Sequence, residues 1–181
     1  MPYYAKIGPI ITIEDWIYRP GKRNFTPREV NLSGNPVCIF CGIISGHADA
    51  SIVFRDDLVT VFMDIHPVNP GHLLVVPNEH ASGIDDVPDT VCARMFIVGR
   101  RMARALRQSG LRCEGVNLLL ADGAAAGQDV FHSHLHVIPR FQGNPGSVGM
   151  HAEFSTAASR QELDGQAEAI RKSLDAADEA V

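Results

Sequence analysis

The chain has 181 residues, of which 45% are hydrophobic and 20% are charged. A chain of this length and composition can bury a sizeable core and lies outside the range of disordered sequences. Its formal net charge of −5 argues against a nucleic-acid polymer as the main partner, because a polyanion repels a chain of the same sign.

No run of apolar residues approaches the roughly 18 to 20 that a membrane-spanning helix needs. The first residues lack the basic start of a signal peptide, and their apolar stretch is broken by Gly8 and Pro9. We therefore expect a cytoplasmic protein that does not span a membrane. In a reducing compartment, a pair such as Cys38-x-x-Cys41 is expected to bind metal or to be redox-active rather than to form a structural disulfide.

Residues 1–37 are rich in proline, glycine and aromatic residues and carry the clustered basic side chains Arg19, Lys22, Arg23 and Arg28. Turn signals recur along this segment, so we expect an irregular N-terminal extension. It could be a surface arm that packs through its aromatic residues. Alternatively, it could reach an anionic ligand or a dimer partner.

At Cys38 the sequence changes to a compact α+β pattern. The segment 38–44 (CIFCGII) suits a short helix or turn. Two β-rich runs at 51–56 and 59–64 flank a tight acidic turn and predict a hairpin, and residues 71–78 predict a third strand.

A long helix is predicted over about residues 89–109, because apolar residues recur there at helical spacing and Gly110 supplies a stop. Two further strands are predicted at 115–122 and 131–140, joined by a loop of small residues at 123–127. These elements predict a domain of five strands with a long helix.

The C-terminal tail contains a helix-start signal, because Ser159 and Glu162 have the spacing of a capping box. Apolar residues then form one helical stripe: Leu163, Ala167, Ile170 and Leu174. We therefore predict an extension at 1–37, a domain at 38–150 and a helical tail at 151–181 that docks on the domain.

Three histidines, His132, His134 and His136, alternate with other residues within the last predicted strand. Residues two apart on a strand share a face and lie about 6.5 to 7 Å apart, so three imidazoles would line up on one side. Such a row can hold a catalytic zinc with an open water position, or it can hold a phosphate while one imidazole attacks it. The loop at 123–127 favours phosphate, because small residues let backbone N–H groups approach an anion closely.

This histidine row resembles the signature of the histidine triad (HIT) family of nucleotide hydrolases and transferases. Here the signature reads HSHLHVI over residues 132–138. The resemblance extends through CIFCGIISG, VFMDIHPVNPGHLLVVPNEH and GVNLLLADGAAAGQDVFH, and so covers about residues 38–141. It implies an α+β fold with a HIT-like five-stranded antiparallel sheet, a long helix and a C-terminal helix.

The resemblance also implies a role for each matching residue. The central His134 would attack the α-phosphorus and form a nucleotidyl-histidine, and His136, His132 and Gln128 would complete the catalytic set around the phosphate. Asp64 would accept hydrogen bonds from the ribose hydroxyls. An apolar wall around the base would be formed by Ile39, Phe40, Ile43, Phe62 and Ile65.

Some bacterial proteins that this sequence resembles bind a structural zinc ion. The matching positions here are Cys38, Cys41, His80 and His132, a Cys₂His₂ set that can close a tetrahedral site. The resemblance therefore implies structural zinc and no organic cofactor. The alternative is a pair of free thiols near a helix start.

The sequence departs from the family pattern near the phosphate site. Ala121 replaces a common Asn, Asp129 replaces a Ser that commonly assists the leaving group, and Ser133 occupies a position that is usually apolar. Asp129 is expected at the substrate site, where its carboxylate could accept a proton from an incoming water or could be turned away from the phosphate. Its charge would disfavour a highly anionic leaving group unless a cation or the basic N-terminal segment compensates. His72 matches a family position and could be structural or functional.

The resemblance implies hydrolysis or nucleotidyl transfer at the α-phosphate of a nucleoside phosphoramidate or dinucleoside polyphosphate, with a purine nucleotide as substrate. It also implies a homodimer that joins two sheets into one of ten strands. One alternative is a nucleotidylyltransferase or phosphorylase that uses a non-water acceptor. Another is a zinc-stabilised nucleotide-binding protein with little turnover.

Overall fold

The structure is a computed structural model and describes residues 38–143 and 157–178. The chain divides into two compact units, Met1–Asp49 and Ala50–Val181. The predicted extension 1–37 and the predicted boundary at residue 150 lie outside the described residues, so the domain limits stay predictions. No helix in the described part of the chain is both long and apolar enough to cross a membrane.

In the first unit, the segment predicted as a helix or turn forms the helix α1, Ile39–Ile44. It begins after Cys38, whose backbone is extended, and Phe40 and Ile43 are its buried residues. It ends where the Ser45 hydroxyl donates a hydrogen bond to the Cys41 carbonyl at 2.8 Å. Gly46 follows with a φ of 78°, a conformation that favours glycine and stops the helix.

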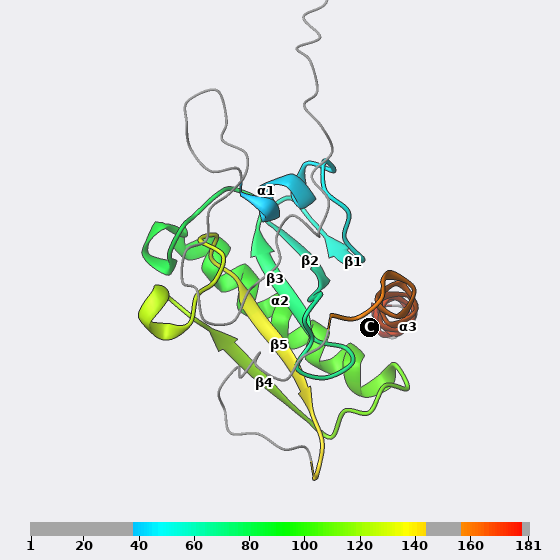
Figure 1. Cartoon of the computed structure of the whole chain (residues 1–181). Helices are drawn as coiled ribbons and strands as arrows, with labels where there is room; N and C mark the ends of the chain where they lie inside the picture. Colours follow the sequence, from blue (N-terminus) through cyan, green and yellow to red (C-terminus); the bar gives the residue numbers. More distant parts are fainter. Residues whose placement is uncertain (1–37, 144–156, 179–181) are drawn as a thin grey trace, which may run out of the picture. The chain divides into compact units, whose positions relative to one another are not determined.

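The second unit contains the predicted five-stranded antiparallel sheet of an α+β fold, which the structure confirms (Figure 1). All paired strands run antiparallel, in the order β1-β2-β3-β5-β4. The strands are β1 (Ile52–Arg55), β2 (Val59–Met63), β3 (Leu73–Pro77), β4 (Gly115–Leu120) and β5 (Leu135–Arg140).

The acidic turn between β1 and β2 is organised by one carboxylate. Asp56 Oδ1 accepts hydrogen bonds from the Leu58 and Val59 backbone N–H groups at 2.9 and 2.8 Å. Its other oxygen, Oδ2, accepts from Arg94 Nε at 2.7 Å. These contacts hold the pKa of Asp56 below its usual value although burial of the carboxyl opposes them. The predicted hairpin is therefore stabilised by Asp56 in its own turn and by Arg94 from the long helix that follows the third strand.

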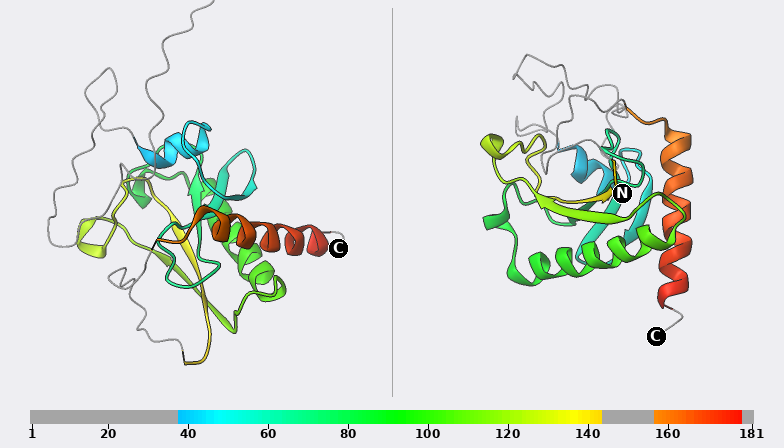
Figure 2. Two further views of the ribbon diagram at one scale, coloured as in Figure 1. Left: turned by 45° about the vertical axis from the view of Figure 1, so that its right-hand side comes forward. Right: turned by 90° about the horizontal axis from the view of Figure 1, so that it is seen from below.

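The long helix α2 spans Asp89–Gln108, close to its predicted range, and lies along one face of the sheet (Figure 2). Its buried residues join alternate residues of the strands in one core that includes Val61, Val75 and Val137. A Cβ at Gly99 would lie 2.9 Å from the Leu135 side chain. The absence of a side chain there therefore lets the helix approach β5 closely.

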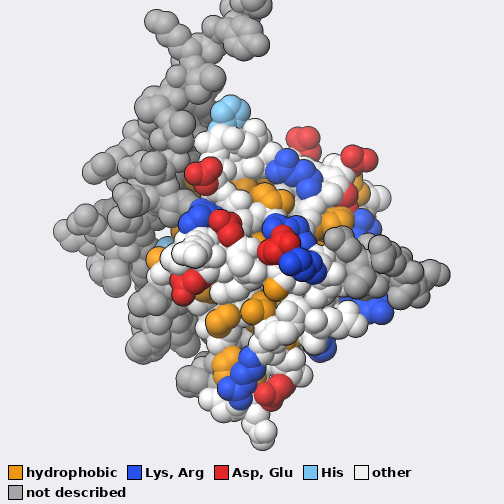
Figure 3. All heavy atoms as spheres, turned by 90° about the vertical axis from the view of Figure 1, so that its right-hand side faces the viewer, with side chains coloured by type: hydrophobic (Ala, Val, Ile, Leu, Met, Phe, Trp, Pro, Cys, Tyr) orange, Lys and Arg blue, Asp and Glu red, His pale blue; other side chains and the backbone are white. Residues whose placement is uncertain are grey.

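The C-terminal helix α3, Arg160–Asp178, packs against α2, β1 and β2 (Figure 2). Its predicted capping box is present, since Ser159 N donates to Glu162 Oε2 at 2.9 Å and Glu162 N donates to Ser159 Oγ at 3.3 Å. The predicted apolar stripe is buried in the core: Leu163, Ala167, Ile170 and Leu174. Acidic and basic side chains are interspersed on the face of the molecule that lies on the side of α3 (Figure 3).

Candidate active site and metal ligands

The face of the sheet away from α2 carries the residues predicted to handle substrate. Phe62, Leu74, His136 and Leu119 are register partners across β2, β3, β5 and β4. Directly opposed residues in a sheet share a face, so these side chains form one row. The core residues that meet α2 occupy the alternate positions. The sheet register therefore places the predicted base-wall residue Phe62 and the third histidine on the same side.

The last strand begins at Leu135 and not at residue 131. The amide of His132 donates to the Val130 carbonyl at 2.9 Å, and that of Ser133 donates to the Ala81 carbonyl at 2.6 Å. These two hydrogen bonds, one to a neighbouring residue and one to a residue distant in the chain, keep the segment out of the sheet ladder. The prediction of three histidines in one row on a strand is therefore wrong, since only His136 lies on β5.

His134 nevertheless lies against His136, with ring centroids 4.7 Å apart in an edge-on arrangement. His134 Nδ1 is 2.7 Å from the His132 carbonyl oxygen. A carbonyl only accepts hydrogen bonds, so Nδ1 carries the proton and the lone pair is on Nε2. Burial lowers the pKa of His134, although the neighbouring His132 carbonyl and the carboxylates of Asp64 and Asp129 oppose this effect. The ring therefore stays neutral near pH 7 and offers a nucleophilic nitrogen.

His136 contacts a histidine whose role the sequence left open. His72 Nε2 lies 3.0 Å from His136 Nδ1, and both rings are buried. Burial and the neighbouring His72 lower the pKa of His136 to about 2. His136 Nε2 is also buried, with no hydrogen-bond partner among the residues that the structure describes. A signal for this contact exists in the sequence, because His72 immediately precedes the strand that pairs with β5.

Asp64 follows β2 and is half-buried beside His72. Asp64 Oδ1 accepts a hydrogen bond from the His66 amide at 2.8 Å, and Oδ2 lies 3.4 Å from His72 Nδ1. The carboxylate that was predicted to bind ribose is thus oriented by a backbone amide two residues further along the chain. It also places a negative charge next to the buried histidines.

Gln128 is buried, and its amide is fully engaged by backbone groups. Its Nε2 donates to the Ser82 and Val130 carbonyls at 2.7 and 3.1 Å, and its Oε1 accepts from the Gly123 amide at 2.8 Å. Gln128 therefore braces the loop before the triad in this conformation. Contact with a phosphate would require it to exchange one of these bonds.

The small-residue loop forms a short 3₁₀ turn at Ala124–Ala126. Its amides at Ala126, Gly127 and Gln128 all donate to carbonyls of the same loop. The expectation that these N–H groups are open to an anion is therefore not met by this conformation. Asp129 follows at the surface, and partial burial raises the pKa of its carboxyl while the nearby His134 lowers it.

The other predicted base-wall residues lie on two elements. In the second unit, Ile65 follows β2, is half-buried and packs against the core. Its carbonyl accepts a hydrogen bond from the Ala158 amide at 3.0 Å, which ties the start of α3 to this segment. In the first unit, Phe40 and Ile43 are buried on α1, and Ile39 is half-buried.

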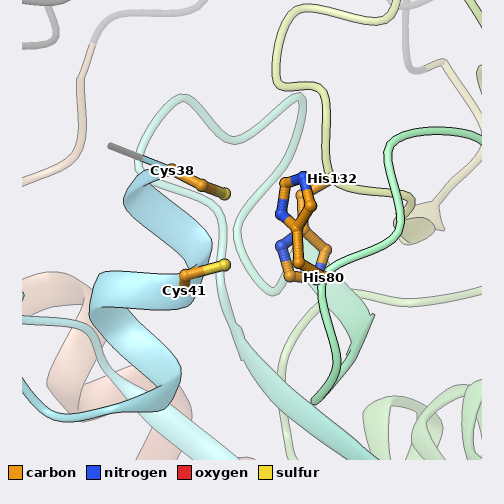
Figure 4. Close-up of side chains that lie close together, drawn as sticks. All are labelled: Cys38, Cys41, His80 and His132. Carbon is orange, nitrogen blue, oxygen red and sulfur yellow. The ribbon is translucent and has the colours of Figure 1, made fainter. Parts of the chain in front are cut away.

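The predicted metal ligands form two pairs, whose side chains are drawn in Figure 4. Cys38 and Cys41 are three residues apart at the start of α1, with their Sγ atoms within 4.8 Å of each other. His80 and His132 present ring nitrogens within the same distance, and their rings meet edge-on with centroids 5.0 Å apart. Each pair thus brings two donors close enough to share one ion.

The hydrogen bonding of His132 suits a metal ligand. Its Nε2 lies 2.9 Å from the Pro77 carbonyl oxygen and must donate to it, which leaves the lone pair on Nδ1. Burial lowers the pKa of His132 to about 4, so the ring is neutral as metal binding requires. Two cysteine thiolates and two imidazoles are the donor set of a closed structural zinc site. The residues present therefore fit zinc.

A family model described as the HIT domain matches residues 45–143, which include the histidine segment and most of the sheet. The chain belongs to the HIT domain family. A zinc-bound histidine triad family protein from Mycobacterium smegmatis is similar, with 38% identity and a TM-score of 0.69, covering 80% of this chain and 97% of that one.

Two more relatives of this HIT-domain protein carry functional names. A protein from Sulfolobus tokodaii described as a hypothetical histidine triad nucleotide-binding protein is 25% identical with a TM-score of 0.68, covering 77% of this chain and 93% of that one. The adenylylsulfatase HINT3 of Arabidopsis thaliana is 33% identical over 107 residues, which are 57% of this chain and 52% of the plant protein. The family thus includes a protein named for nucleotide binding and a protein named for an enzymatic activity.

Proposed function

We propose that this HIT-domain protein is a nucleotide hydrolase or nucleotidyl transferase that acts through a nucleotidyl-histidine on His134. The observation that carries the proposal is the hydrogen bond from His134 Nδ1 to the His132 carbonyl, which leaves the nucleophilic lone pair on Nε2. The names of the S. tokodaii and A. thaliana relatives support a nucleotide ligand and an enzymatic activity.

In the proposed reaction, His134 Nε2 forms a bond to the α-phosphorus as the bond to the leaving group breaks. The leaving group departs with the bonding electron pair and takes a proton from solvent or from a nearby acid. Water or another acceptor then attacks the phosphorus, loses a proton, and releases His134 with its lone pair restored. His136 contributes a donor toward the phosphoryl oxygens, where negative charge increases in each transition state. Asp64 and Phe62 bind the nucleoside.

The leaving group is proposed to be neutral or cationic, as in a nucleoside phosphoramidate, because Asp129 replaces the common serine. A carboxylate beside the phosphate repels a polyphosphate leaving group and tolerates an amine. We expect Asp129→Ser to raise activity on dinucleoside polyphosphates relative to phosphoramidates. An unchanged ratio of kcat/KM values would show that Asp129 does not set this preference.

The proposal is tested by incubating the protein with purine nucleoside phosphoramidates, dinucleoside polyphosphates and nucleotide sugars. Rapid quenching followed by intact-mass measurement should reveal one nucleotidyl group on wild type and none on His134→Ala. Discharge by water alone supports a hydrolase, and discharge only by a second substrate supports a transferase or phosphorylase. Tight nucleotide binding without turnover of any substrate would favour the third possibility, a nucleotide-binding protein.

We also propose that Cys38, Cys41, His80 and His132 bind one structural zinc ion, which the zinc-bound M. smegmatis relative supports. When bound, zinc would supply a cross-link between residues far apart in the sequence. All four ligands would come from the protein, so no position would remain for substrate. Because one chain supplies all four ligands of one tetrahedral site, metal analysis of the purified protein should give about one zinc per chain.

A homodimer is proposed through the β4 edge of the sheet. β4 pairs only with β5 among the described strands, and Leu118 on it is 40% exposed. Phe96 and Ile97 of α2 are 49% and 47% exposed. An open sheet edge and exposed apolar side chains each favour association with a second copy. Sedimentation equilibrium should give a dimer mass for wild type and a monomer mass for Ile97→Glu.

A further inference from the structure

We propose that residues 81–84, named here the strap, position the nucleophile and that Asp122 is the positioning residue that anchors the strap. This assignment rests on the proposed function, because the strap acts on His134. The strap directly follows His80 and reads Ala-Ser-Gly-Ile. Its hydrogen bonds join it to the histidine segment and to the loop that precedes that segment, both distant from it in the sequence.

The first contact of the strap fixes one peptide group beside the nucleophile. The Ser133 amide donates to the Ala81 carbonyl at 2.6 Å, and both residues are buried. The same peptide group carries the His132 carbonyl, which accepts from His134 Nδ1 at 2.7 Å. The N–H and C=O of a trans peptide lie in one plane and point to opposite sides. Ala81 therefore sets the direction in which the His132 carbonyl meets the nucleophile, and the two hydrogen bonds polarise each other.

Two further contacts tie the strap to the loop at 123–127. The Ser82 carbonyl accepts from Gln128 Nε2 at 2.7 Å, and Gln128 is buried. The Ile84 amide donates to Asp122 Oδ1 at 2.9 Å. Asp122 precedes the loop and Gln128 follows it. The strap is thus bonded to both ends of this loop as well as to the peptide group next to the nucleophile.

The contact with Asp122 can be changed without altering the core. Asp122 is exposed, whereas Ala81 and Ser133 are buried. Gly83 fits closely against its carboxylate, because a Cβ at Gly83 would lie 3.0 Å from Asp122 Oδ1. Gly83 has a φ of −128°, which any residue can adopt, so Gly83→Ala would displace the carboxylate without straining the backbone. The same contact can therefore be broken from either side.

The first test measures amide hydrogen exchange in the full-length protein without substrate. We expect Asp122→Ala to speed exchange of the Ser133 amide by about tenfold, because the strap that holds it loses its anchor. Exchange of the Val98 amide in the buried part of α2 should not change. Asp122→Asn keeps an acceptor oxygen and should restore slow exchange. Asp85→Ala, at an exposed acidic position next to Ile84, is the control.

Kinetics then test whether the strap acts on the nucleophile. Asp122→Ala and Gly83→Ala should each lower kcat by about tenfold, because the His132 carbonyl no longer holds His134 in its reactive position. KM should change little, since the residues proposed to bind the nucleoside lie on and directly after β2. The double variant should lose no more than either single variant, since both changes remove the same contact. All variants are compared at equal measured zinc content, because the strap adjoins the proposed ligand His80.

The outcomes separate this inference from the proposed function. Unchanged Ser133 exchange in Asp122→Ala would overturn the anchoring role, and faster exchange with unchanged kcat would overturn the positioning role. Equal acceleration at Ser133 and Val98 would show that Asp122 only stabilises the fold, which also overturns the inference.

If wild type turns over no nucleotide, the proposed function fails, and long-range ¹H–¹⁵N spectra of the His134 ring test the strap alone. We expect the ring proton on Nδ1 in wild type and shared between Nδ1 and Nε2 in Asp122→Ala. The same single tautomer in both proteins would overturn the inference.

Discussion

The two histidine pairs that flank β3 resemble each other in composition but differ in what they present. His80, after β3, meets His132 with ring centroids 5.0 Å apart, and His72, before β3, meets His136 at 5.2 Å. The antiparallel register of β3 and β5 explains this order, since the start of one strand lies beside the end of the other.

The difference comes from the partner of one nitrogen in each pair. His132 donates to the Pro77 carbonyl and keeps a lone pair for a metal. His136 Nδ1 lies 3.0 Å from His72 Nε2, and its own Nε2 is buried with no hydrogen-bond partner among the described residues. The pair at His132 therefore offers a lone pair to a metal, whereas the pair at His136 leaves one buried ring nitrogen without a partner. His134 lies between them, with its lone pair fixed by the His132 carbonyl.

The largest loss of activity should come from replacing His134, which lies between the two histidine pairs. His134→Ala is expected to lower kcat by at least three orders of magnitude, because the covalent route disappears. Nucleotide binding should persist, since Asp64 and Phe62 remain. Steady-state kinetics and calorimetric titration measure the two effects, with His66→Ala as the control. Retention of more than a tenth of wild-type kcat would exclude His134 as the nucleophile.

The next largest effect should be on stability at the His132 end. Cys41→Ser should lose zinc and lower the free energy of unfolding by several kcal/mol, since structural zinc contributes about 10 kcal/mol or more of binding free energy in small domains. Thermal melting with metal analysis tests this, and Cys92→Ser on α2 is the matched control. Zinc kept by Cys41→Ser and lost from His134→Ala would point to a catalytic metal instead.

A third prediction concerns pH at the His136 end. Burial lowers the pKa of His136 from 6.5 to about 2, so the unfolded chain binds a proton that the folded chain does not. Proton binding to the unfolded chain therefore lowers the free energy of unfolding as the pH falls below 6.5, by about 1.4 kcal/mol per pH unit. Above pH 6.5 this loss of stability is absent. His136→Gln should flatten the slope below pH 6.5 in denaturant titrations. An unaltered slope would mean that the native ring can be protonated.

The smallest effect should come from the residue between His132 and His134. Ser133 Oγ is buried with no hydrogen-bond partner in the described part of the chain, so Ser133→Ala should raise the unfolding free energy by about 1 kcal/mol. Ser51 is a matched contrast, because its hydroxyl donates to Asp164 at 2.6 Å and Ser51→Ala should destabilise. Urea denaturation compares the two. A loss of stability in Ser133→Ala would show that the hydroxyl has a partner in solution.

The sequence was sufficient for the elements whose signals are local. The helical periodicity of 89–109, the capping box at Ser159 and the acidic turn at Asp56 each depend on neighbouring residues, and the structure contains all three. The antiparallel five-stranded sheet followed from the resemblance, whereas the order of its strands was not predicted and comes from the structure.

The sequence misplaced the start of β5, because alternation cannot reveal that the Ser133 amide bonds to Ala81, which is distant in the chain. For the same reason it left His72 undecided. Its contact with His136 depends on the β3–β5 register, and the direction of its proton depends on the Val68 amide. Hydrogen-bond polarity in the site is thus a property of tertiary structure.

The central claim is a covalent nucleotidyl-histidine, and the stereochemistry at phosphorus tests it most directly. A nucleoside phosphorothioate that is chiral at the α-phosphorus would be hydrolysed by wild type in ¹⁸O-enriched water, and the configuration of the product determined by ³¹P NMR. Attack by His134 followed by attack of water makes two in-line displacements, so we predict overall retention of configuration. Inversion would indicate a single displacement by water and would contradict the account.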